Sequence, residues 1–77
     1  MHQNGTTKLV EEMRELSQVL AKRKAHPEEQ LDRRIEEGIA DVFASIVFVQ
    51  EELNLSEEFI MEQAQKKHNL LTQKGDA

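Results

Sequence analysis

The stretch that decides the fold is IADVFASIVFV, residues 39–49, which is apolar at nearly every position. Its polar residues are Asp41 and Ser45. It shows no strand-like alternation, and a helix that is apolar on every side is expected to be buried on every side. Asp41 therefore needs a partner in the interior, because a carboxylate buried alone is strongly destabilising.

The residues before this stretch predict an amphipathic helix. Its apolar residues recur at steps of four, three and four, which places them on one stripe: Leu9, Met13, Leu16 and Leu20. Thr6 or Thr7 is expected to cap the first turn of this helix. Residues 1–6 are expected to form a flexible lead.

Two further helices are expected. Proline is tolerated in the first turn of a helix, so the second helix should begin at Pro27 and run to about Leu53. Ser56 is a good N-cap for a third helix, which should end near residue 73 and leave residues 74–77 frayed. Residues 7–73 then form one all-α domain, a helical hairpin followed by a third helix.

The length and the cysteine content predict how such a chain is stabilised. A chain of 77 residues buries too little apolar surface to be comfortably stable alone. It has no cysteine, which excludes disulfides and thiolate metal sites and is typical of a reducing, cytoplasmic compartment. We therefore expect a homodimer or homotetramer that completes a helix bundle.

The charge and the hydropathy exclude some classes of protein. A net charge of −5 disfavours a nucleic-acid binder, which needs a basic face. The longest apolar stretch is about half the ~20 residues that a bilayer requires, so no membrane span is expected. The negative charge does not forbid an anionic substrate, because bound Mg²⁺ lets a carboxylate-rich pocket accept phosphates.

Four acids stand out by their position relative to the apolar stripes. Glu12 lies inside the apolar arc of the first helix, and Glu15 lies at its border. Glu37 lies one turn before Asp41 on the second helix, so their carboxylates are expected to converge. Carboxylates at this spacing repel unless a cation lies between them. Paired oxygen ligands without a well-placed histidine favour Mg²⁺ or Mn²⁺.

The same pattern has a purely structural explanation. Of the 77 residues, 15 are acidic, so acids three residues apart arise by chance. Glu11, Glu12 or Glu15 could instead pair with a nearby basic side chain: Arg14, Lys22 or Arg33. Lys66 and Lys67 are more simply explained as a solvated face than as a phosphate clamp.

With these residues in place, the sequence resembles the MazG-like, all-α nucleoside triphosphate pyrophosphohydrolases. Their signature is E-E-x-x-E on one helix and E-x-x-D on the next. Residues 11–15, EEMRE, match the first motif in full, and residues 35–42, IEEGIADV, resemble the second. The resemblance implies that Glu12, Glu15 and Asp41 bind the metal.

The sequence departs from the family pattern at two places. Gly38 stands where the second motif has a glutamate, and Glu37 is the neighbour that could replace that ligand from a different angle. In the third helix the family often carries a K-x-x-x-N phosphate-binding pattern. Asn69 matches it, but the lysine position holds Gln65, and Lys66 is adjacent. The chain therefore looks like a minimal or divergent member.

The resemblance also implies an activity. It is the Mg²⁺-dependent hydrolysis of a nucleoside or deoxynucleoside triphosphate to the monophosphate and pyrophosphate, a housekeeping reaction of the nucleotide pool. Lys66 or Asn69 would contact the phosphates. The alternative is a catalytically degenerate helical module of the same fold, which oligomerises and binds a nucleotide or a protein without turnover. Gly38 and Gln65 favour this alternative.

Overall fold

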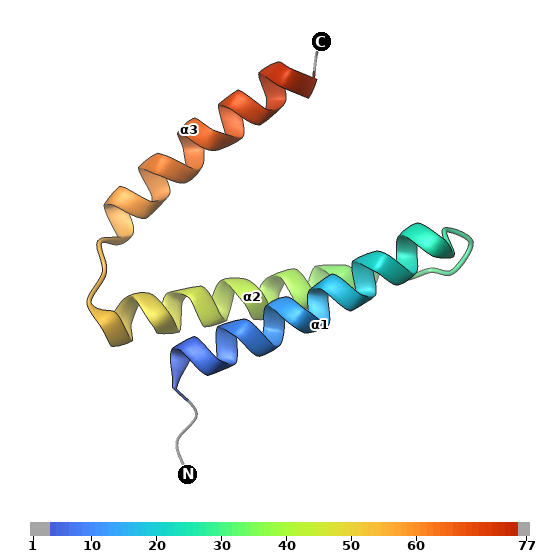
Figure 1. The fold of residues 1–77 in the computed structure, drawn as a ribbon, viewed down its shortest axis with the longest axis horizontal. Coiled ribbons are helices and arrows are strands. Elements are labelled where there is room, and N and C mark those ends of the chain that lie inside the picture. Colours follow the sequence, from blue (N-terminus) through green and yellow to red (C-terminus); the bar gives the residue numbers. More distant parts are fainter. Residues whose placement is uncertain (1–3, 76–77) are drawn as a thin grey trace.

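The computed structural model describes residues 4–75, with side chains to residue 73. These residues form three helices: α1 (Gly5–Ala25), α2 (Asp32–Leu53) and α3 (Glu57–Gly75). No strand occurs in this part of the chain, which confirms the predicted all-α class (Figure 1). None of the described helices is long and apolar enough to cross a membrane. Outside the described residues lie residues 1–3 of the predicted flexible lead and residues 76–77 of the predicted frayed end.

The helices are arranged as a hairpin with one separate arm. Helices α1 and α2 run antiparallel and contact one another, whereas α3 diverges from the far end of α2 (Figure 1). The resulting shape is flat and open, with extents of 41 × 38 × 15 Å. The hairpin therefore supplies the packed part of this chain.

The start of α1 differs from the prediction, which placed the N-cap at Thr6 or Thr7. Asn4 is the cap, because its Oδ1 accepts a hydrogen bond from the Thr7 N–H at 2.7 Å. The N–H of Gly5 donates to the two carboxylate oxygens of Glu52 at 3.0 and 3.2 Å. An acid at the end of α2 thus satisfies a free N–H at the positive end of α1.

The start of α2 also differs, since the helix begins at Asp32 and not at Pro27. Residues 26–31 form a turn closed by backbone hydrogen bonds. Leu31 at the end of this turn is only 6% exposed, and Arg23 Nε lies 2.8 Å from Asp32 Oδ1. Burial of one leucine and an ion pair between the two helices accompany this later start.

The end of α2 lies at Leu53, as predicted. Asn54 adopts the left-handed conformation (φ 54°, ψ 48°), and the Leu55 N–H donates to the Gln50 carbonyl at 2.9 Å. The Asn54 N–H donates to the carbonyl of Glu51 at 3.3 Å. These are the two hydrogen bonds of a Schellman motif, which ends a helix and fixes the direction of the chain after it.

The predicted cap of α3 is confirmed. Ser56 Oγ accepts a hydrogen bond from the Phe59 N–H at 3.1 Å. The helix continues to Gly75, so residues 74 and 75, predicted to fray, belong to it. Only residues 54–56 separate α2 from α3.

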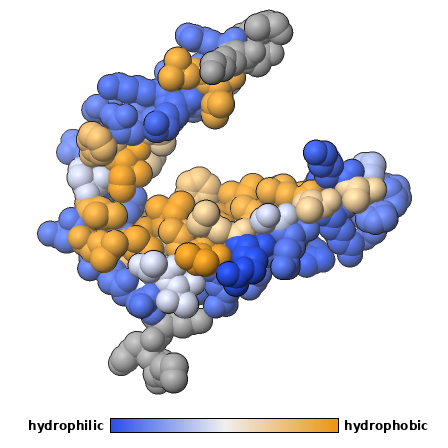
Figure 2. Space-filling view, in the orientation of Figure 1, coloured by the Kyte–Doolittle hydropathy of each residue, from blue (hydrophilic) through white to orange (hydrophobic). Residues whose placement is uncertain are grey.

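The apolar stretch 39–49 was expected to be buried on every side, and in the single chain it is not. Phe43 is 64% exposed and Ile39 is 41% exposed. Among the described residues, Leu31 is the one large apolar residue that is buried, and it is still 6% exposed. A space-filling view shows apolar surface along α2 and on the side of α3 that faces it (Figure 2). Burial of this surface requires contacts that a single chain does not make.

Candidate functional site

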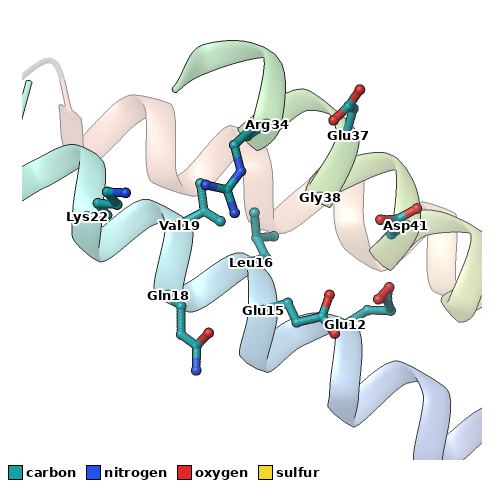
Figure 3. Close-up of a pocket in the computed structure, with 10 residues that line it drawn as sticks. All are labelled: Glu12, Glu15, Leu16, Gln18, Val19, Lys22, Arg34, Glu37, Gly38 and Asp41. Atoms are coloured by element: carbon teal, nitrogen blue, oxygen red, sulfur yellow. The ribbon is translucent and has the colours of Figure 1, made fainter. Parts of the chain in front are cut away.

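A pocket of about 540 Å³ lies between α1 and α2 (Figure 3). All four acids singled out in the sequence line it, Glu12 and Glu15 from α1 and Glu37 and Asp41 from α2. The remaining lining residues are Leu16, Gln18, Val19, Lys22, Arg34 and Gly38. Two sequence motifs about 25 residues apart are therefore brought to one cavity by the antiparallel hairpin.

Glu12 is the buried acid of this pocket. It is 6% exposed, and its nearest cation is Lys8, whose Nζ lies 3.9 Å from Glu12 Oε1. Burial is the largest cause of a raised pKa at Glu12, and the negative charge of Glu15 raises it further. Lys8 lowers this pKa in part, whereas Asp41 raises it. The pocket thus disfavours the negative charge of Glu12, and a cation would relieve this.

Asp41 is exposed in the single chain, contrary to the expectation that it lies in the interior. Its neighbour one turn later, Ser45, is buried instead, and the Ser45 hydroxyl donates to the Asp41 carbonyl at 2.8 Å. Figure 3 shows Asp41 on the side of the pocket where Glu12 and Glu15 lie, while the carboxylate of Glu37 points away from them. Glu37 is also exposed.

Gly38, which replaces the motif glutamate, is part of the pocket wall. A Cβ added at this position would lie 3.1 Å from Leu16 Cδ1, so α2 passes close to α1 here. Because Gly38 lines the cavity, a longer side chain at this position would enter it. The position where the MazG-like motif has a glutamate thus lies in the wall of this pocket.

Two basic side chains in the pocket were not identified as site residues from the sequence. Arg34 extends into the space between the helices (Figure 3), and it makes no ion pair within the described part of the chain. The Nζ of Lys22 lies 3.6 Å from Glu29 Oε1, so this cation is already paired. The sequence signal for Arg34 is its spacing, one turn before Gly38, but an arginine among many charged residues does not stand out.

Lys66 and Asn69, the predicted phosphate contacts, lie on α3 and do not line this pocket. Lys66 Nζ lies 3.7 Å from Glu62 Oε1, and Asn69 Oδ1 accepts a hydrogen bond from Gln65 Nε2 at 3.2 Å. Both side chains are exposed. One chain does not bring them to the acids, and their role stays a prediction.

A second group of possible metal ligands lies in the turn between α1 and α2. His26, Glu28 and Glu29 offer ligand atoms within 4.8 Å of one another, and all three are exposed. His26 Nδ1 lies 3.4 Å from Glu28 Oε2, and Glu29 pairs with Lys22, so contacts within the protein account for this group. Within the described residues, no three of the pocket acids come equally close together.

Comparison of the chain with known proteins found no matching family, no similar curated protein and no similar solved structure. The likeness to the MazG-like enzymes is therefore carried by the motif residues alone. Function has to be argued from the chemistry of the pocket.

Proposed function

We propose that this chain is a metal-dependent nucleoside triphosphate pyrophosphohydrolase that works as a homo-oligomer. It would hydrolyse an NTP or dNTP to the monophosphate and pyrophosphate. The observation that carries the proposal is one pocket that contains acids from both motifs together with Arg34. Its volume of about 540 Å³ lies in the range of small-molecule sites, roughly 300–1,000 Å³.

The donor set of the pocket fits Mg²⁺ or Mn²⁺. All of its acidic donors are carboxylate oxygens, and neither a histidine nor a cysteine lines it. Glu12, Glu15 and Asp41 would hold the ion, and the exposed Glu37 could turn in as a further ligand. Burial, and then the negative charge of Glu15, raise the pKa of Glu12, and a bound cation would favour its ionised form. When bound, the ion supplies charge neutralisation of the phosphates and a bound water of lowered pKa.

The other pocket residues would bind and orient the substrate. The planar guanidinium of Arg34 can donate two hydrogen bonds to one phosphate, which fixes its orientation as well as its position. Leu16 and Val19 supply apolar wall. An apolar wall beside Arg34 lowers the local dielectric and so strengthens the attraction of its guanidinium for phosphate.

Release of pyrophosphate from a panel of NTPs and dNTPs, with and without Mg²⁺, tests the proposal. We expect Mg²⁺-dependent formation of monophosphate and pyrophosphate, and an increase in KM of about 10-fold to 100-fold for Arg34→Ala. This corresponds to the loss of a hydrogen bond to a charged group, about 1.5–3 kcal/mol.

Arg33→Ala is the matched control for this variant. Arg33 Nε pairs with Glu36 Oε1 at 3.6 Å, and the side chain does not line the pocket. Its removal should leave KM unchanged. Absence of Mg²⁺-dependent pyrophosphate release from every common NTP and dNTP would remove the enzymatic claim.

A second candidate function is a degenerate module that binds a nucleotide without turnover. Gly38 favours it, because the pocket lacks one carboxylate of the motif. In the described part of the chain, no three of the pocket acids have ligand atoms within 4.8 Å of one another, which also favours this candidate. A nucleotide that raises the melting temperature with Mg²⁺ but releases no pyrophosphate would favour this candidate.

A further inference from the structure

An exposed apolar row runs along α2. Ile39, Phe43 and Val47 recur at steps of four, so they share one side of the helix, and they are 41%, 64% and 47% exposed. Asp41 lies two residues before Phe43, and at about 100° per residue the two project to nearly opposite sides. The apolar row and the acid pocket therefore occupy different sides of the hairpin.

Exposed apolar residues also lie at both ends of α3. Phe59 and Leu70 are 11 residues apart, which is close to three helical turns, so they share one side of the helix, and Leu71 lies about 100° further round. All three are more than half exposed. Figure 2 shows apolar surface on α2 and on α3 at the sides that face the opening between them. We call these six residues the exposed apolar face: Ile39, Phe43, Val47, Phe59, Leu70 and Leu71.

The linker between the helices keeps α3 away from its own hairpin. The Schellman motif at Asn54 and the Ser56 cap together order the residues from the end of α2 to the first turn of α3. These hydrogen bonds leave only the backbone between Leu55 and Ser56 free to rotate, which limits how α3 can fold back onto α2. The exposed apolar face is thus not covered from within the chain.

The area of the surface indicates what covers this face. The chain exposes 6606 Å², whereas a compact protein of 8.9 kDa exposes about 4,800 Å². The excess is on the order of 1,000–2,000 Å². Obligate homodimers bury roughly 1,000–2,500 Å² on each chain, so one second copy accounts for it.

The charges favour one way of pairing two copies. Residues 5–53 of the hairpin contain 11 acids and seven bases, whereas α3 contains three acids, all within its first six residues, and three lysines after them. Stacking hairpin on hairpin would bring like charges together. Laying α3 of one copy on the hairpin of the other brings opposite charges together.

We infer that two copies of this chain exchange α3, so that the α3 of each copy packs Phe59, Leu70 and Leu71 on the α2 row of the other. This inference names the surface through which the chain assembles, and it requires neither bound metal nor turnover. Because the acid pocket lies on another side of the hairpin, the exchange leaves the pocket accessible.

Cross-linking between cysteine variants of different mass tests the exchange, since the natural chain has no cysteine. A full-length Val47→Cys chain and a tagged Leu70→Cys chain are refolded together and treated with a short bis-maleimide. We expect a linked heterodimer, and light scattering of the unmodified protein should give at least twice the mass of 8.9 kDa. The matched control is Asp41→Cys, which is also exposed on α2 but projects to nearly the opposite side from Phe43, and should give little product.

The doubly substituted chain Val47→Cys/Leu70→Cys distinguishes exchange from folding back. Cross-linking of this variant should give products that contain two chains. An internal link within one chain would overturn the inference, and so would a monomeric mass at micromolar concentration. Equal product from Asp41→Cys and Val47→Cys would also overturn it. None of these results depends on pyrophosphate release, so the inference and the proposed function can fail separately.

Discussion

Replacing Gly38 with glutamate restores the carboxylate of the motif, and glutamine at the same position is its uncharged control. A Cβ there would lie 3.1 Å from Leu16 Cδ1 but 3.8 and 3.9 Å from Leu16 Cβ and Cα. Only the flexible end of one leucine must move, which costs about 1 kcal/mol. Removing glycine from a helix interior returns a similar amount, close to 1 kcal/mol, so both variants should fold.

The two variants should then differ in their response to metal. In EDTA at pH 7, Gly38→Glu should be less stable than Gly38→Gln, because it adds a negative charge beside Glu12 and Asp41. In Mg²⁺ the order should reverse. One additional ligand that tightens binding about tenfold adds about 1.4 kcal/mol, which corresponds to roughly 5–10 °C for a chain of this size.

Thermal denaturation followed by circular dichroism, at one protein concentration, measures this reversal. A parallel assay of pyrophosphate release shows whether Gly38→Glu also gains activity. The reasoning is refuted if the glutamate and glutamine variants respond equally to Mg²⁺, since Gly38 would then not face a metal site.

Three further predictions concern stability. In metal-free protein, Glu12 of the folded chain keeps its proton to higher pH than Glu12 of the unfolded chain, because folding raises its pKa. The free energy of unfolding should therefore fall as pH rises from 4.5 through the raised pKa. Glu12→Gln should remove this component, and an unaltered pH profile of unfolding would contradict the assignment. Gly5→Ala should destabilise the fold by about 1–3 kcal/mol in urea denaturation, because its Cβ would meet a backbone atom of α2 at 3.2 Å; unchanged stability would mean that the helices separate freely here. Asn4→Ala should cost about 1 kcal/mol and Thr6→Ala much less, and the opposite order would return the cap to Thr6.

Features of the fold that depend on neighbours in sequence could be predicted. The helical class follows from apolar residues spaced at helical intervals, and the cap of α3 follows from Ser56. The starts of α1 and α2 could not be predicted, because distant partners determine them. The Gly5 N–H donates to Glu52, 47 residues away. Leu31 is buried at the end of the turn that follows α1, and Pro27 alone does not predict that this turn continues to Leu31.

The candidate site, too, could be predicted from the sequence only in part. Periodicity placed Glu12 inside the helix pair, and Glu12 is buried. Asp41 was expected in the interior because its neighbours are apolar, but apolar neighbours can be covered by a second chain while the acid stays exposed. Arg34 was missed because charged residues are frequent in this sequence, and only the packing of two helices shows which of them share a cavity.

Calorimetric titration with Mg²⁺ and Mn²⁺ tests the central claim, that the pocket acids bind a divalent ion, most directly. The unmodified chain should bind one ion, and Glu12→Gln should weaken binding by about tenfold or more. Glu36→Gln, next to Glu37 but outside the pocket and paired with Arg33, should leave affinity unchanged. Absence of binding to the unmodified chain, or equal affinity of the Glu12 and Glu36 variants, would contradict the account.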